Sequence, residues 1–246
     1  MFGDHFAPAK QLLAIVQSVV GPTRELTDVL DARSRGRWEH GGQYRGRPLR
    51  ILLLHRHASG ATGQLAGVEL GAPLGGRPLE AWLDLAPPAQ SQTGLPNGET
   101  SVLPHVEVYG FPVDVMRSVL DPATVAAMRA NATASRVEAL TTEGDWLCAF
   151  LRVDGEMPDA AAISRVLDLL CGAADRFAGA FDHLHTEAQR VGGPAAAAQW
   201  LASQRAGAHI RREKRQRSRM IAIGIAIVVM FVIVSVIIAL AVLVRC

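Results

Sequence analysis

The sequence predicts an α+β fold, with a mostly antiparallel sheet flanked by helices and followed by a C-terminal transmembrane helix. Segments in which apolar residues alternate gather in the middle of the chain, and segments with apolar residues three and four apart come before and after them. Strands grouped in this way between helices are typical of α+β domains. The third observation is a stretch of 25 residues, 220–244, that carries no charge.

The N-terminal segment, residues 1–34, is predicted to be helical. Residues 7–20 are expected to form a helix that Gly21-Pro22 ends. The apolar side chains that would lie near one face of this helix are Leu12, Leu13, Val16, Val19 and Val20. Thr23 is expected to cap a second short helix that continues to about Ala32.

Residues 35–190 are predicted to form an α+β domain in the cytosol. Period-two alternation indicates two strands joined around Gly46, further strands, and a hairpin that turns at Glu143-Gly144-Asp145. The further strands are expected at residues 63–70, 79–85 and 106–111. The order of strands in the sheet does not follow from these patterns.

Three helices are expected later in this domain. Residues 113–120 form the first, and Asp121 with Pro122 opens the second as N-cap and first helical residue. A long helix is predicted from Pro158 to about Arg190, and Gly192-Gly193-Pro194 breaks it.

Residues 191–219 are predicted to be a helical stalk, and residues 220–244 a membrane span. A helix of 25 residues is ~37 Å long, enough to cross a bilayer core of ~30 Å. Basic residues crowd the N-terminal flank and only Arg245 follows the span, so the positive-inside rule predicts a cytoplasmic N-terminal domain. We therefore expect a tail-anchored, single-pass protein of the inner or plasma membrane, with its C-terminus on the far side.

The charge distribution indicates which partners to expect. Residues 1–204 carry 17 Lys or Arg against 22 Asp or Glu, whereas residues 205–246 carry 8 against 1. Basic charge confined to the flank of a span predicts contact with the lipid bilayer and its anionic headgroups rather than with nucleic acid. The predicted headgroup contacts are Arg211, Arg212, Lys214, Arg215, Arg217 and Arg219. The acidic domain would be repelled by the same surface and held away from it on the stalk.

Motifs for catalysis or for a cofactor are absent from the sequence. It contains no phosphate-binding glycine loop, no Gly-x-Ser-x-Gly and no His-Glu-x-x-His, and the prediction is that no cofactor is bound. The candidate metal ligands are His55 and His57, which share a face if their strand is regular. His40, Glu69 and His105 are the additional donors within the sequence, and the alternative is two polar residues at a strand end.

Seven arginines crowd residues 33–56, with Glu39 the only acid among them: Arg33, Arg35, Arg37, Arg45, Arg47, Arg50 and Arg56. They indicate either solvated strand edges or a surface that binds an acidic partner or a phosphate. The three cysteines, Cys148, Cys171 and Cys246, do not form a disulfide framework or a metal motif.

A Gly-x-Tyr-x-Gly-Arg hairpin (Gly42, Tyr44, Gly46 and Arg47) is followed by an apolar strand and, later in the chain, by a final hairpin and helix. In these features residues 36–178 resemble a loose group of uncharacterised bacterial membrane-associated proteins. The resemblance implies an α+β domain and brings no catalytic residue. Under it, the motif residues define turns of the fold.

These features favour a non-enzymatic module that binds another protein at the membrane. One alternative is a membrane-tethered metal-dependent enzyme that uses His55 and His57. Another is an accessory subunit of a membrane complex, in which Gly224 and Ser235 let a second helix approach the span.

Overall fold

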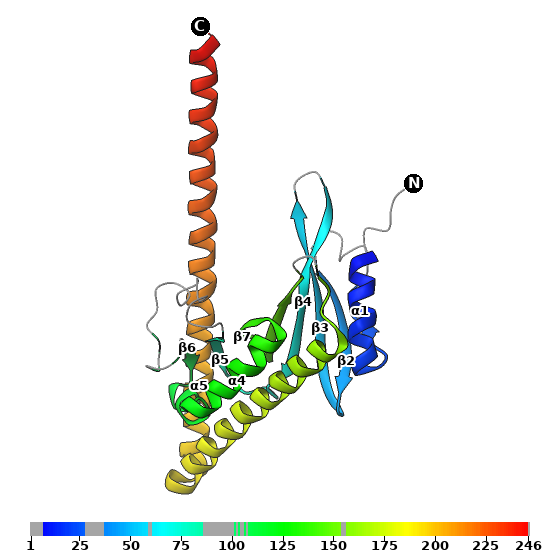
Figure 1. Cartoon of the computed structure of the whole chain (residues 1–246). Coiled ribbons are helices and arrows are strands. Elements are labelled where there is room, and N and C mark those ends of the chain that lie inside the picture. The colour runs from blue at the N-terminus through cyan, green and yellow to red at the C-terminus, as the bar shows by residue number, and fades with distance from the viewer. Residues whose placement is uncertain are drawn as a thin grey trace.

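A computed structural model describes most of the chain, and Figure 1 shows its architecture. The backbone is described for residues 7–27, 37–58, 61–85, 101, 103, 106, 108–153 and 156–245. Within these, the side chains of residues 55–58, 61–64, 212, 214–229 and 231–245 are left undescribed. The statements below concern the described part.

One antiparallel sheet of eight strands forms the centre of the molecule. Its order is β1-β2-β3-β4-β8-β7-β5-β6, so the hairpin β7–β8 inserts between β4 and β5. The fold is therefore α+β with an antiparallel sheet, as predicted. The strands are β1 Arg24–Glu25, β2 Arg37–Tyr44, β3 Arg47–Ala58, β4 Ala61–Pro73, β5 Glu80–Asp84, β6 Val108–Phe111, β7 Val137–Glu143 and β8 Trp146–Arg152.

Helices cover one face of this sheet. They are α1 (Ala7–Val20), α3 (Val113–Val119), α4 (Pro122–Ser135) and the first half of α5 (Ala160–Arg245). Alternation along the strands decides which side chains meet them: Leu49, Ile51 and Leu53 of β3 join the hydrophobic core, and Arg50 points to the other face.

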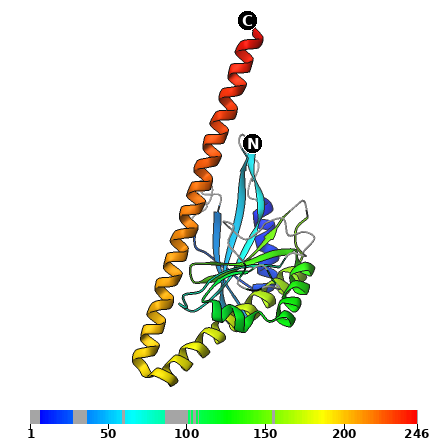
Figure 2. The same ribbon diagram turned by 90° about the vertical axis from the view of Figure 1, so that its left-hand side faces the viewer.

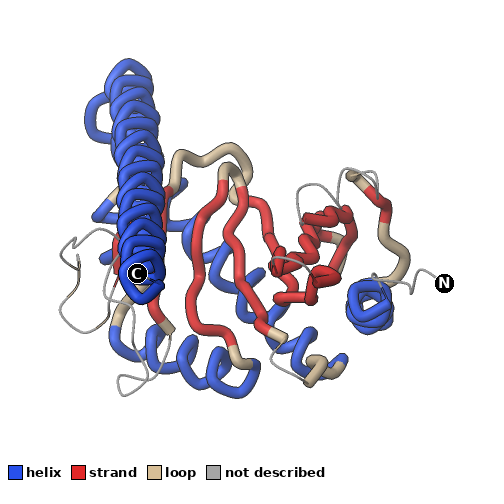
Figure 3. The backbone as a smooth tube through the Cα atoms, turned by 90° about the horizontal axis from the view of Figure 1, so that it is seen from above, coloured by secondary structure: helices blue, strands red, loops and turns tan. Residues whose placement is uncertain are grey.

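Helix α5 changes direction at Gly193, where φ is 74° and ψ is −175°. Beyond this kink the helix folds back, and Trp200 packs on Phe181 of the first half at a ring distance of 4.9 Å. The second half then passes the end of the sheet at β5 and β6 (Figure 2). Seen from above, it stands at one end of the molecule and α1 at the other (Figure 3).

The second half of α5 lies on the face of β6 that the core helices leave free. A Cβ on Gly110 would clash with Met116 of α3, whereas a Cβ on Gly207 of α5 would lie 2.3 Å from the Phe111 ring. Gly110 and Phe111 are neighbours and so point to opposite faces. The edge strand β6 is therefore held between α3 and the returning part of α5.

The predicted membrane span lies mostly outside the fully described residues. Helix α5 continues through it to Arg245. Among the residues that the structure describes in full, no helix is long and apolar enough to cross a membrane.

The expected helix at residues 23–32 is wrong at its start. Arg24 and Glu25 form β1, which pairs with Gly41 and His40 of β2, and residues 28–36 lie outside the described part. A strand of two residues is too short to show an alternating pattern, so the sequence shows no sign of β1. Thr23 therefore suggested a helix cap, although pairing with β2 decides the conformation of this segment. The prediction for Asp121 is confirmed, because its side chain accepts hydrogen bonds from the backbone of Ala123 and Thr124.

Candidate functional site: a charged cluster on the open face of the sheet

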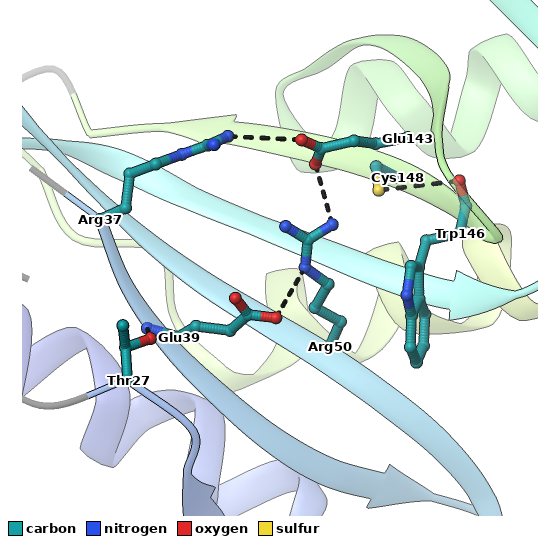
Figure 4. A network of polar contacts seen from close by, with 7 residues as sticks. All are labelled: Thr27, Arg37, Glu39, Arg50, Glu143, Trp146 and Cys148. Atoms are coloured by element: carbon teal, nitrogen blue, oxygen red, sulfur yellow. Dashed lines mark hydrogen bonds and ion pairs between the residues drawn. The ribbon is translucent and has the colours of Figure 1, made fainter. Parts of the chain in front are cut away.

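The face of the sheet opposite α1, α3 and α4 carries a cluster of charged side chains on the central strands. Arg50 of β3 is its centre, with a side chain only 15% exposed. Its Nε donates to Glu39 of β2 at 3.0 Å, and its Nη1 donates to Glu143 of β7 at 2.9 Å. Arg37 adds a second cation 3.5 Å from Glu143. Figure 4 shows these groups extending across several strands.

Two further groups adjoin Glu143. Glu69 of β4 and Cys148 of β8 bring a carboxylate oxygen and a thiol to within 4.8 Å of it and of each other. The ladder explains the meeting, because Gly71, two residues along from Glu69, pairs with Cys148, and Glu143 is across the β7–β8 turn from Trp146. Glu69 Oε1 is buried and has no hydrogen-bond partner among the described residues.

The two carboxyl groups titrate in opposite directions. Burial, with the negative charge of Glu143 second, raises the pKa of Glu69. Burial also acts to raise the pKa of Glu143, but the positive charges of Arg50 and Arg37 outweigh it and hold that pKa below its ordinary value. The pair therefore favours a neutral Glu69 beside an ionised Glu143.

The cluster as built does not support nucleophilic catalysis. Cys148 is almost completely buried, and burial raises the pKa of its thiol, so the reactive thiolate is suppressed. Glu69, Glu143 and Cys148 offer the donor types that zinc accepts. Arg50 already supplies the counter-charge to Glu143 at 2.9 Å, so a cation would have to displace it. The arrangement is that of a charge-compensated surface tying β2, β3 and β7 together.

The histidines proposed as metal ligands lie at the far end of β3. The side chains of His55 and His57 are outside the described set. The ladder between β3 and β4 shifts between Leu54 and His55 and again between Arg56 and Ala58, so the regular alternation assumed for these residues is interrupted.

The additional donors named with them do not converge. His40 is buried on the core side of β2, its ring 4.6 Å from that of Trp38, and burial lowers its pKa. Glu69 points to the other face of the sheet, in the charged cluster. His105 lies outside the described residues. The structure therefore does not bring His40 and Glu69 to one site.

The Gly-x-Tyr-x-Gly-Arg hairpin attaches the sheet to α5. Tyr44 donates its hydroxyl hydrogen to Asp168 at 2.9 Å, and Arg45 pairs with the same carboxylate at 2.9 Å. Gly46 takes a positive φ of 76° at the turn, which returns the chain so that Arg47 can pair with Asp175. These residues join the hairpin to the helix.

Sequence analysis missed the partner of this hairpin, although a signal was present. Asp168, Asp175 and Asp182 are spaced seven residues apart on α5 and so lie on one side of it. Arg77, from the β4–β5 connection, pairs with Asp182 at 2.8 Å. The crowded arginines that the structure describes are thus engaged with acids of the same chain; Arg33 and Arg35, and the side chain of Arg56, lie outside the described part.

Of the predicted headgroup contacts, the structure describes the side chain of Arg211. Its guanidinium carbon lies 5.0 Å from the Phe111 ring centroid and 5.3 Å from that of Tyr109. The side chains of Arg212, Lys214, Arg215, Arg217 and Arg219 are outside the described set.

Comparison with known proteins finds a distant similarity in fold. No model of a protein family matches the chain, and no curated protein matches it. Among solved structures, the crystal structure of the mycobacterial trehalose monomycolate transport factor A, TtfA, is similar with a TM-score of 0.44 and 15% identity, over 70% of this chain and 94% of that one. This similarity is too distant to bring an activity with it.

Proposed function

We propose that this protein is a single-span membrane protein whose α+β domain acts as an accessory module that binds a partner protein at the cytoplasmic surface. The observation that carries the proposal is the path of α5. Its second half is packed on the domain as far as Arg211, and the uncharged residues 220–244 follow in the same helix.

This path implies a domain close to the bilayer, and not one held away from it on a stalk of residues 191–219, because this segment packs back on the domain at Trp200, Gly207 and Arg211. Residues 212–219 separate the last packed side chain from the start of the span, which is ~12–14 Å of helix at 1.5 Å per residue. The helix is continuous here, so the domain is presented in one orientation instead of swinging on a flexible linker. The end of β3 and the start of β4 point to the same side as the end of α5 (Figure 1). In this proposal the β3–β4 hairpin therefore faces the membrane.

The open sheet face is the surface we assign to the partner. It carries aromatic side chains that are partly exposed, Trp82, Trp146 and Phe150, beside the charged cluster around Arg50. Aromatic residues and arginine are enriched where proteins bind each other.

The membrane anchor is tested by fractionating cells that produce the full chain or a chain ended after Arg211. We expect the full chain in the membrane fraction, resistant to extraction with high salt, and the shortened chain in the soluble fraction. A soluble full chain, or a shortened chain that stays with membranes, contradicts the proposal.

Orientation is tested with a maleimide that cannot cross membranes, applied to intact cells. It should label Cys246 but not a cysteine placed at the exposed position Ala161, because the span separates the two sides. Native Cys148 is buried and serves as an internal unreactive control. Labelling at position 161 with none at Cys246 would mean that the protein has the opposite topology.

Partner binding is tested with a photo-reactive amino acid placed in the full chain. At position 146 it should give a discrete adduct with another protein, whereas at the exposed position 189 on α5 it should give none. Equal crosslinking at both positions, or none at either, contradicts a docking role for the open face.

A further inference from the structure

A cavity separate from the charged cluster lies where the end of α4, the end of β8 and the start of α5 meet. Its volume is ≈180 Å³, below the about 300–1,000 Å³ of pockets for drug-sized ligands. The polar residues that line it are Ser135, Arg136, Arg152, Glu156, Asp159 and Arg165. Nothing in the proposed function uses this cavity.

Three arginines of the lining come from three different elements. Arg136 follows α4 directly, with φ of 58°, Arg152 ends β8, and Arg165 is on the first turns of α5. Arg165 donates to the carbonyl oxygen of Ala134 at 3.5 Å, which places it against the last turn of α4. Guanidinium groups that converge on one cavity are suited to an oxyanion, because each offers several donors in a plane.

Ser135 provides a donor with no other task. The residue is 3% exposed and lines the cavity, and its hydroxyl has no hydrogen-bond partner within the described part of the chain. A buried hydroxyl without a partner costs free energy. A ligand oxygen in the cavity would remove that cost.

The two carboxylates of the lining, Asp159 and Glu156, differ in how strongly they would compete with a bound anion. Asp159 accepts the backbone N–H of Ala162 at 2.6 Å and is thereby committed as the cap of α5. Glu156 instead binds Arg136 at 3.1 Å through side chains that are 74% and 71% exposed. Exposed ion pairs contribute about 0–1 kcal/mol, so a bound anion can displace this carboxylate at little cost. Arg152 lies 3.6 Å from Glu138, outside the lining.

We propose that this cavity binds a small phosphate-bearing anion through Arg136, Arg165 and the hydroxyl of Ser135, and that Glu156 occupies the mouth of the site until the anion replaces it. The start of α5 adds its positive dipole end on the same side. The volume admits inorganic phosphate or the phosphate group of a small ester or lipid headgroup, and these share the chemistry that the site recognises.

Titration calorimetry of the full chain in an uncharged detergent, in phosphate-free buffer of low salt, tests the site with inorganic phosphate and glycerol 3-phosphate. We expect saturable binding of one anion per chain. Arg165→Gln and Ser135→Ala should each weaken it about tenfold or more, as expected when a hydrogen bond to a charged group is lost. Glu156→Gln should strengthen binding, because it removes the competing carboxylate.

Arg117→Gln is the matched control, since Arg117 is an exposed arginine on α3 that pairs with Asp114 away from the cavity. It should bind like the unmodified chain. Ser135→Ala distinguishes a loss of binding from a loss of folding. Removal of a buried hydroxyl without a partner should leave the thermal unfolding temperature unchanged or raise it, so weaker binding by this variant cannot be due to unfolding. No binding by the unmodified chain, or an equal loss in Arg117→Gln, overturns the proposal, as does a Glu156→Gln variant that binds more weakly.

Short-chain phosphatidic acid, compared with phosphatidylcholine of the same chain length, separates the two sources of phosphate. Tighter binding of phosphatidic acid than of glycerol 3-phosphate, lost in Arg165→Gln, assigns the site to a lipid headgroup. Equal binding of the two assigns it to a soluble phosphate. Binding of both that persists in Arg165→Gln contradicts the site.

Discussion

Arg211 rests on Phe111, with its guanidinium carbon 5.0 Å from the ring centroid. Four residues earlier on the same side of α5, Gly207 lets the helix approach this ring so closely that a methyl group would not fit. The two contacts attach the residues leading to the uncharged segment directly to the edge strand β6. A cation over an aromatic ring contributes ~0.5–1 kcal/mol at exposed sites, so the close approach at Gly207 is the more sensitive of the two.

Replacing Gly207 should separate α5 from β6. In Gly207→Leu the Cβ would lie 2.3 Å from Phe111 Cζ, so the helix must shift. We expect hydrogen exchange of the β6 amides, followed by mass spectrometry on the full chain in detergent, to become faster. Ala206→Leu adds the same side chain at an exposed neighbouring position and should leave exchange unchanged. Unchanged protection of the β6 amides in Gly207→Leu would mean that the contact at Gly207 does not hold α5 against β6.

The kink of α5 should depend on glycine at position 193. Its φ of 74° with ψ of −175° lies in a region that side chains with a Cβ avoid, although open space surrounds it. Gly193→Ala should therefore lower the free energy of unfolding by about 1–3 kcal/mol. Urea unfolding followed by tryptophan fluorescence measures this.

Gly179 supplies the control for that substitution. It lies inside the first half of α5, also without a neighbour that a Cβ would meet, and has ordinary helical geometry. Gly179→Ala should raise stability by about 0.5–1 kcal/mol, since alanine favours a helix over glycine. If the kink depends on glycine, the free energy of unfolding should fall in Gly193→Ala and rise in Gly179→Ala.

Local patterns predicted most elements of this fold because their causes are local. The alternation of Leu49, Ile51 and Leu53, the cap at Asp121 and the break at Gly193 each depend on residues within a few positions. The sheet order could not be predicted, because inserting β7–β8 between β4 and β5 depends on contacts between residues far apart in the chain.

The same limit applies to the sites. The charged cluster joins Arg50, Glu69, Glu143 and Cys148 from four strands, and no spacing in the sequence relates them. His55 and His57 were predicted as metal ligands because residues two apart share one face of a regular strand. The aspartates of α5 did have a readable spacing of seven, but their partners lie on the β2–β3 hairpin and on the β4–β5 connection, more than 100 residues away.

The hydrogen bond between Tyr44 and Asp168 should contribute measurably to stability. Tyr44→Phe removes the hydroxyl that donates to Asp168 at 2.9 Å and also contacts Ser164. We expect a loss of about 1.5–3 kcal/mol in the free energy of unfolding, the range for hydrogen bonds to charged groups. Asp168→Asn and the double variant complete a cycle, and a coupling energy near zero would contradict a direct interaction.

The pKa of Glu69 predicts a dependence of stability on pH. Because that pKa is raised in the folded state, mainly by burial, the folded protein holds the proton more tightly than the unfolded chain. The stability that this bound proton contributes is fully present below the pKa of an unfolded glutamate, ~4.3, and is lost as pH rises through the pKa of Glu69 in the folded protein. Glu69→Gln, which stays neutral, should therefore gain stability over the unmodified chain progressively as pH rises from about 4 to neutrality.

Glu143→Gln should show the opposite behaviour. The pKa of Glu143 is lowered, because Arg50 and Arg37 outweigh its burial, so its stabilising effect is present above the pKa of an unfolded glutamate and is lost as pH falls through the folded value. Its substitution should cost stability at neutral pH, leaving Arg50 without one of its two carboxylates, and cost little in acid. Unfolding by urea at a series of pH values compares both variants with the unmodified chain, and parallel pH profiles for the two would contradict the opposite roles assigned to these carboxyl groups.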